Sequence, residues 1–388
     1  MTDPSGPQSP SRKSIVRSVL SDFADAGRMI DDALQNWWRE LGELGSDPAR
    51  TRLCLVAALT VPLATTMALW LEVESVWWAA ISGYMTIMAS GAASIRKGLL
   101  RMAGTIGGAA VGFVMARWLP YDHFALNLFL AGATMLGVIA MQVSPHGLAW
   151  LFATITSILV LLEGMNNPLQ VPFIAFYRIF EVGIGVTASA IVANLFMHWH
   201  ADPAPQLPGW RHLLGPQWPS LLHGIRAAIA VLIMMQVWIL MDLPQVTEMA
   251  ISIAVVMSAP VIGSGSLGTR HAVAERSLHR VLGCLLGGLA ALGVLALNVT
   301  SFPWWLAILG SGVWIGMHIQ NGRHGVGYLG TQAAFVFIVT LIQGPKPPDS
   351  IMPAIDRFAG IAGGMTILLI ISLVLWPNEV ERKAERTS

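Results

Sequence analysis

Apolar residues along this chain are gathered into twelve long segments separated by short polar stretches. Each segment is close to the roughly 20 residues that an α-helix needs to cross the hydrocarbon core of a membrane. The segments lie near residues 52–71, 76–94, 99–118, 124–142, 147–164, 173–198, 221–241, 246–263, 277–297, 303–320, 326–343 and 355–376. The pattern predicts an all-α membrane protein with about twelve transmembrane helices.

The pattern differs before the first apolar segment. Residues 1–13 are rich in Pro, Ser, Gly and basic residues and predict a disordered start. Between Ser14 and Leu44, apolar side chains recur at roughly helical spacing among charged ones, which predicts an amphipathic helix. This helix can lie on the cytoplasmic membrane surface or pack as a solvated helix against the protein, and the sequence leaves both open.

Arginine positions repeat with one spacing in the two halves of the chain. Arg280 follows Arg101 by 179 positions (280 − 101 = 179), and Arg357 follows Arg178 by the same number (357 − 178 = 179). A shared period in two pairs indicates a duplicated unit. With six helices in each unit, both units enter the membrane in the same direction, which predicts two parallel six-helix repeats.

The repeat divides the chain into five predicted regions. They are a cytoplasmic N-terminal segment with the amphipathic helix (1–50), a first six-helix repeat (51–199), a linker (200–219), a second six-helix repeat (220–377) and a cytoplasmic tail (378–388).

Composition supports the membrane class. The 388 residues are 54% hydrophobic and 12% charged, whereas soluble domains carry about 25% charge. A net charge of +1 gives no case for a nucleic-acid partner. Lysines and arginines of short loops concentrate on the side of the N-terminus, which predicts that both termini are cytoplasmic. Examples are Arg96, Lys97 and Arg101 between segments two and three, and Arg270, Arg276 and Arg280 between segments eight and nine.

Glycines follow the first arginine of each half at four-residue spacing: Gly104, Gly108 and Gly112 in one half, Gly283 and Gly287 in the other. On a spanning helix this spacing makes a flat strip that favours close helix packing. The strips can also let their helices shift against neighbours during transport.

The repeated arginines are the candidate functional residues. Arg101 and Arg280 can extend to the cytoplasmic headgroups or face inward and attract an anionic solute. Arg178 lies deeper in its segment, where an arginine is costly unless it faces a bundle interior or a cavity. It can form a structural ion pair with Glu181 or, together with Arg357, line a path for a carboxylate substrate. The neighbouring acids, Glu181 and Asp356, are then candidates for proton coupling.

Other chemistry finds little support in the sequence. The histidines at 198, 200 and 212 have no cysteine or carboxylate at ligand spacing, so we expect no metal site. Gly263-Ser-Gly265-Ser-Leu-Gly268 follows a spanning segment and not a strand, which excludes a dinucleotide fingerprint and makes it a flexible loop. We find no catalytic constellation, and we expect no cofactor and no enzymatic activity.

One motif resembles a known family. A basic stretch leading into Arg101-Met-Ala-Gly104-Thr105-Ile-Gly-Gly108, repeated with six segments per half, is similar to the fusaric acid resistance and aromatic acid exporter family of bacterial inner-membrane proteins. The resemblance implies export of organic acids, often beside a periplasmic adaptor protein. Many members carry a cytoplasmic domain after each half, of which we expect almost none here, and Cys284 replaces the motif threonine in the second copy. The six-helix unit is also distantly similar to plant malate-type anion channels.

These observations give one functional hypothesis and two alternatives. We expect a multi-pass inner-membrane transporter that exports organic, in particular aromatic carboxylic, acids with energy from the proton gradient. A passive anion channel and a membrane assembly component without transport are the alternatives. Expected partners are the organic anion, membrane lipid, a periplasmic adaptor and a second copy in a homodimer. Arg178 and Arg357 are stronger site candidates than Arg101 and Arg280, because the glycine motif that follows Arg101 mainly indicates helix packing.

Overall fold

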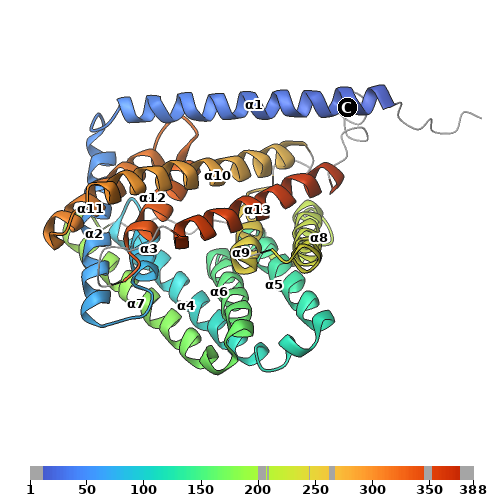
Figure 1. Ribbon diagram of the computed structural model, residues 1–388, viewed down its shortest axis with the longest axis horizontal. Coiled ribbons are helices and arrows are strands. Elements are labelled where there is room, and N and C mark those ends of the chain that lie inside the picture. Colours follow the sequence, from blue (N-terminus) through green and yellow to red (C-terminus); the bar gives the residue numbers. More distant parts are fainter. Residues whose placement is uncertain are drawn as a thin grey trace, which may run out of the picture.

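Helices account for the regular structure of this protein. The computed structural model describes residues 12–199, 207, 209–243, 245–261, 267–344 and 352–375, and these residues include no β-strand. Their α-helices, shown in Figure 1, are α1 (Arg12–Gly42), α2 (Pro48–Trp70), α3 (Val76–Thr86), α4 (Gly91–Met115), α5 (His123–Val143), α6 (Gly147–Asn166), α7 (Val171–Phe196), α8 (Trp218–Met241), α9 (Val246–Met257), α10 (Leu267–Ala296), α11 (Phe302–Gln320), α12 (Gly327–Leu341) and α13 (Met352–Leu375).

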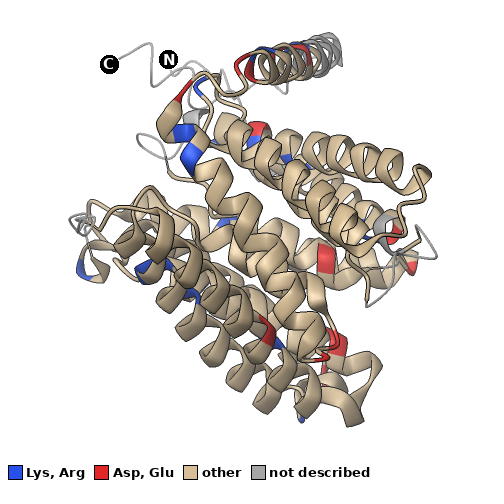
Figure 2. Ribbon diagram, turned by 90° about the vertical axis from the view of Figure 1, so that its left-hand side faces the viewer, with Lys and Arg blue, Asp and Glu red and all other residues tan. Residues whose placement is uncertain are grey.

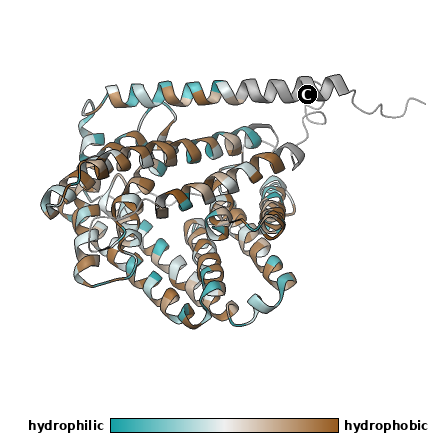
Figure 3. Cartoon of the chain, viewed as in Figure 1, coloured by the Kyte–Doolittle hydropathy of each residue, from teal (hydrophilic) through white to brown (hydrophobic). Residues whose placement is uncertain are grey.

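The membrane class is confirmed. Within the described ranges, nine helices are long and apolar enough to cross a membrane, and apolar residues dominate the bundle below α1 (Figure 3). Each of the helices α2–α13 overlaps the corresponding one of the twelve predicted segments, although α4 and α10 begin eight or more residues before theirs. The arrangement as twelve spans in two parallel repeats, the five regions and the cytoplasmic position of both termini stay predictions. Residues 1–11 of the predicted disordered start, residues 200–206 and 208 of the linker, the loop residues 262–266 and the tail 378–388 lie outside the described residues.

Three helices are shorter than predicted. α3 has 11 residues, α9 has 12 and α12 has 15, whereas a spanning helix needs about 20. Of these, α3 and α9 hold corresponding positions in the two halves. Helices that end within a membrane protein are tolerated where their free backbone groups are buried in protein or line a cavity.

Local capping explains why α3 ends early. Ile87 has an extended backbone (φ −67°, ψ 132°). The side chain of Ser90 accepts a hydrogen bond from the backbone N–H of Ala93 at 3.1 Å, which starts α4 at Gly91. The basic residues 96, 97 and 101 therefore lie inside α4 and not in a loop between helices, and residues 270, 276 and 280 lie inside α10. The assignment of residues 96, 97, 270 and 276 to loops was therefore wrong, whereas the predicted segments 99–118 and 277–297 already included Arg101 and Arg280.

Helix pairing corresponds between the two halves. In the first half α4 packs on α6 and α3 packs on α7; in the second, α10 packs on α12 and α9 packs on α13. The first helix of each half packs on a helix of the other half: α2 packs on α11, and α8 packs on α5. One buried core joins residues of both halves, including Leu159 of α6, Met257 of α9 and Met365 of α13.

The glycine strips lie at close contacts between helices. Gly104, Gly108 and Gly112 of α4 face α6, and Gly283 and Gly287 of α10 face α12. A Cβ atom on Gly108 would lie 2.8 Å from the Cα atom of Ala153, and one on Gly287 would lie 2.7 Å from the Cα atom of Ala333. These distances leave no room for a side chain, so the strips set the spacing of α4 from α6 and of α10 from α12.

α1 runs across one end of the bundle (Figure 1). Its apolar residues Ala33, Trp37 and Leu41 pack against a cluster that includes Ile319 and Leu329. The C-terminal part of α1 therefore packs on the protein. Trp38, on another face of the helix, is 69% exposed.

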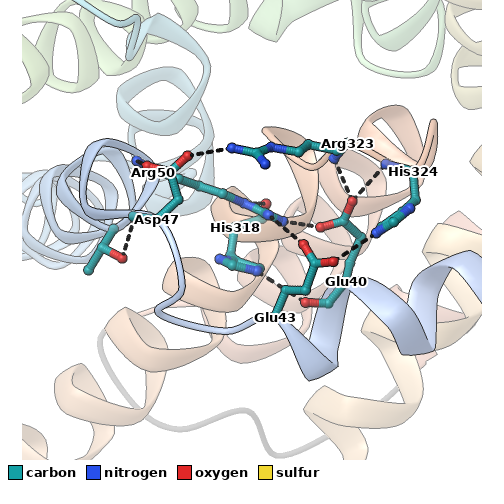
Figure 4. A network of polar contacts seen from close by, with 8 residues as sticks. Glu40, Glu43, Asp47, Arg50, His318, Arg323 and His324 are labelled. Carbon is teal, nitrogen blue, oxygen red and sulfur yellow. Dashed lines mark hydrogen bonds and ion pairs between the residues drawn. The ribbon is translucent and has the colours of Figure 1, made fainter.

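A buried carboxylate fixes α1 to the turn between α11 and α12 (Figure 4). Glu40 is fully buried and accepts hydrogen bonds from the Arg50 guanidinium and from the backbone N–H groups of Arg323 (2.6 Å) and His324 (2.8 Å). Burial raises the pKa of Glu40, but these hydrogen bonds lower it more, so its pKa lies below the ordinary value of 4.5. Arg50 also donates from Nε to the carbonyl of His318 at 2.7 Å.

Gly108→Ala tests the strip. The added methyl group meets the backbone of Ala153, so we expect a loss of about 1–3 kcal/mol of stability, measured as a lower Tm in detergent. Gly107→Ala is the matched control on the same helix, because nothing lies within 4 Å of its Cβ position. Equal Tm values for the two variants would contradict the packing role.

Glu40→Gln tests the attachment of α1. Loss of the buried ion pair with Arg50 is expected to cost about 3 kcal/mol at pH 7, whereas Asp32→Asn on the exposed face of α1 has little effect. Because the folded-state pKa is lowered, the stabilisation is complete above 4.5 and is lost as the pH falls below that value. Wild type and Glu40→Gln should therefore converge in Tm at acid pH; a constant difference at all pH values would refute this account.

Candidate functional site

A cavity of about 310 Å³ lies between the two halves of the bundle. Most lining residues come from α3, α4, α6 and α7 in the first half and from α9, α10, α12 and α13 in the second. Met141 of α5 and Gln320 of α11 add one residue each. The short helices α3 and α9 are therefore both part of the cavity wall, where backbone that does not continue as a spanning helix is tolerated.

Charged residues are sparse on the membrane helices (Figure 2), yet six basic residues line this cavity. The basic lining residues are Lys97, Arg101, Arg178, Arg276, Arg280 and Arg357. No acidic side chain is among the described lining residues. All four arginines predicted from the repeat thus reach one cavity, together with two further basic residues.

Arg101 and Arg280 have corresponding surroundings. Arg101 is 3% exposed and donates from Nη2 to the Oγ atom of Ser82 on α3 at 2.9 Å. Arg280 is 5% exposed and donates from Nε to the Oγ atom of Ser252 on α9 at 3.0 Å. Both guanidinium groups are buried at the short helices, which excludes extension to the lipid headgroups.

The other partners of these two arginines are neutral. The Arg101 guanidinium lies 4.2 Å from the ring centre of Phe152 and donates to the sulfur of Met85 at 3.0 Å. Arg280 donates to the Gln332 side chain at 2.9 Å and to the Tyr328 hydroxyl at 3.3 Å. Among the residues that the structure describes, no carboxylate forms an ion pair with either arginine.

Arg178 and Arg357 have acidic partners instead. Arg178 lies 3.3 Å from a carboxylate oxygen of Glu181 and 3.7 Å from one of Glu163. Arg357 lies 3.0 Å from a carboxylate oxygen of Glu248. Their positive charges are therefore largely compensated within the protein.

The two acids proposed for proton coupling are placed differently. Glu181 is 1% exposed and, besides contacting Arg178, accepts a hydrogen bond from the backbone N–H of Ser75 at 2.8 Å, immediately before α3. Asp356 is half-buried and is not a lining residue of the cavity. Arg357 pairs with Glu248 of α9 and not with its sequence neighbour.

Sequence reasoning missed several residues of this site. No spacing in the sequence connected Glu248 of α9 with Arg357 of α13. Lys97 and Arg276 were assigned to loops, and their four-residue spacing from Arg101 and Arg280 places them on the same helix faces. Tyr328 and Gln332 lie on α12, and no pattern in the sequence connected them with Arg280.

Six buried polar atoms of cavity-lining residues have no hydrogen-bond partner among the described residues. They are Nε of Arg101, Arg178, Arg276 and Arg357, Nε1 of Trp78, and the hydroxyl oxygen of Tyr84, a residue that is 1% exposed. All six can donate hydrogen bonds, and buried donors are normally satisfied. A bound ligand with acceptor oxygens would satisfy those donors that it reaches. Within the described part of the chain, no group of three or more His, Cys, Asp or Glu side chains could hold a metal ion.

Comparisons with known proteins point to a transporter family. Residues 54–207 match the fusaric acid resistance protein family, and residues 229–371 match the family described as fusaric acid resistance protein-like. A stretch of 160 residues is 26% identical to the "Uncharacterized transporter GOX0755" of Gluconobacter oxydans (strain 621H). It covers 39% of this chain and 21% of that protein, so the match spans about a fifth of the relative's length. No solved structure matches the chain.

The two family matches fall one in each half and together cover most of the helices that form the cavity. Nine of the described helices are long and apolar enough to cross a membrane, as expected for a multi-pass membrane protein. The chain belongs to the fusaric acid resistance protein family.

Proposed function

We propose that this membrane protein exports organic acids, in particular aromatic carboxylic acids, and that the proton gradient drives the export. The observation that carries the proposal is the cavity between the halves, which is lined by six basic side chains and by no described acidic one. An arginine at the centre of a bilayer costs roughly 2.5–3.5 kcal/mol or more. An anion that enters the cavity offsets this cost.

Arg101 and Arg280 are the proposed anion-binding pair. Their protein partners are neutral, so their charge is available to a carboxylate, which can accept two hydrogen bonds from one guanidinium. Arg178 and Arg357 add to the positive field, although their carboxylate partners reduce it. The unpartnered Tyr84 hydroxyl is a further donor for the ligand.

The walls of the cavity support an aromatic substrate. The rings of Tyr84, Phe152, Tyr328 and Phe335 all contribute to the lining. Aromatic rings attract one another in edge-to-face and offset arrangements. A volume of about 310 Å³ lies at the lower end of the range of roughly 300–1,000 Å³ that is usual for ligand pockets. Shape and polarity therefore suit a small anion with an apolar ring.

Direction, energy source and location complete the proposal. Export across the bacterial inner membrane, with a periplasmic adaptor as partner, follows from the family resemblance. Proton coupling is assigned to a carboxylate beside the arginines, and Glu181 suits this role better than Asp356, because it contacts Arg178 at the cavity. Exposed apolar helix faces suit lipid and a second copy of the chain as further partners.

Arg101→Gln and Arg280→Gln test the anion site. Each variant loses a charged donor, so efflux of radiolabelled benzoate from cells should fall at least about tenfold, since a hydrogen bond to a charged group contributes about 1.5–3 kcal/mol. Arg117→Gln is the control, because Arg117 is exposed and is not a lining residue. Normal membrane abundance of all three variants is checked by immunoblot. Undiminished efflux by Arg101→Gln and Arg280→Gln would overturn the proposal.

Glu181→Gln tests the proton coupling. In proteoliposomes, a pH gradient should drive benzoate accumulation by the wild-type protein, and an uncoupler should abolish it. Glu181→Gln keeps an acceptor for the Ser75 N–H but cannot exchange a proton, so gradient-driven accumulation should fall to the uncoupled level. Asp356→Asn is expected to remain within about twofold of wild type. A benzoate flux through the wild-type protein that does not depend on the pH gradient would indicate a passive channel.

A further inference from the structure

Four side chains stack in a row at one end of the cavity. The Arg178 guanidinium lies 4.2 Å from the ring centre of Trp78, and the rings of Trp78 and Trp77 stack with their centres 4.4 Å apart. The Arg357 guanidinium completes the row, 5.0 Å from the ring centre of Trp77. The row therefore alternates from cation to two aromatic rings and back to cation, with an attractive contact at each step.

The row connects the two halves of the protein. Trp77 and Trp78 lie in the first turn of α3, and Arg178 lies on α7, both in the first half; Arg357 lies near the start of α13, in the second half. Trp78, Arg178 and Arg357 are lining residues of the cavity. The row thus crosses the cavity at the end where α3, α7 and α13 begin, which is the predicted outer side.

Carboxylates hold both ends of the row. Glu163 and Glu181 contact Arg178, and Glu248, in the first turn of α9, contacts Arg357. Glu181 also binds the N–H of Ser75 immediately before α3, so it fixes the helix that carries the tryptophans. An anion bound at Arg101 or Arg280 is therefore separated from the Trp77–Trp78 end of the cavity by this row. The arginines in the row already have carboxylate partners.

We propose that Trp77 and Trp78 form a constriction that closes this end of the cavity and limits the size of the anion that can leave through it. The contact of Trp77 with Arg357 is the weakest step of the row, because it is the longest and crosses between the halves. Separation of Trp77 from Arg357 opens the constriction. The size limit rests on the proposed transport function, whereas the closure itself does not.

Thiol labelling tests the closure without any substrate. Cys54→Ala and Cys284→Ala remove the two native cysteines, and Thr156→Cys adds one reporter in the cavity wall. A membrane-impermeant methanethiosulfonate reagent is applied to intact spheroplasts or to inside-out vesicles. With Trp77→Ala or Trp78→Ala, labelling from the side on which α3 begins should accelerate at least about tenfold, because the rate follows the population of the open state. Labelling from the opposite side should not change.

Matched variants make the outcome decisive. Trp304→Ala removes a tryptophan from the first turn of α11 that is 69% exposed, and Trp77→Phe keeps a ring for Arg357; both should label like the parent. Trp77→Leu replaces Trp77→Ala if the latter does not accumulate, and it should also label faster. Unchanged labelling in every variant at positions 77 and 78, or equal acceleration from both sides, overturns the constriction.

Transport by the same variants tests the size limit. Trp77→Ala should export bulkier carboxylates, such as naphthoate, faster relative to benzoate than the parent protein does. An unchanged ratio despite faster labelling would overturn the size limit alone. Benzoate transport that persists in Arg101→Gln and Arg280→Gln bears on the proposed function and leaves the labelling result intact.

Discussion

Positive charge without an acidic partner inside an apolar helical bundle is the constraint on which this structure depends. Arg101 and Arg280 are each more than nine-tenths buried, and their described partners are hydroxyl, amide, thioether and aromatic groups. Such an arrangement is costly unless a cavity and an anion compensate it. The short helices α3 and α9 make it feasible, because each presents a serine to one of the two arginines.

The remaining architecture keeps this arrangement in place. Glycine strips bring α4 to α6 and α10 to α12, and these four helices carry Arg101, Phe152, Arg280 and Gln332. The attachment of α1 by Glu40 lies next to the same region, since the turn that it holds follows Gln320, a lining residue. At the other end, acids compensate Arg178 and Arg357. The cavity therefore has one end with available charge and one end with neutralised charge and stacked aromatic rings.

The sequence predicted the helices better than the site. Apolar segment lengths located a helix for each segment, because burial in lipid requires long apolar runs. The end of α3 depends on the cap of Ser90, which hydropathy does not register. The shared period selected four arginines that meet at one cavity. The sequence favours Arg178 and Arg357 over Arg101 and Arg280, because Arg178 lies deep in its segment and because the Arg101 motif indicates helix packing. In the structure the two pairs differ in partners such as Glu248, which packing between helices supplies.

Equilibrium binding tests the central claim most directly, because it needs neither a gradient nor a direction of transport. Purified protein in detergent is titrated with radiolabelled benzoate in competition with benzamide, which has the same ring and no charge. The account predicts saturable binding of benzoate, little competition by benzamide, and loss of binding in Arg101→Gln and Arg280→Gln. Equal binding of the acid and the amide, or unchanged binding in both variants, would contradict it.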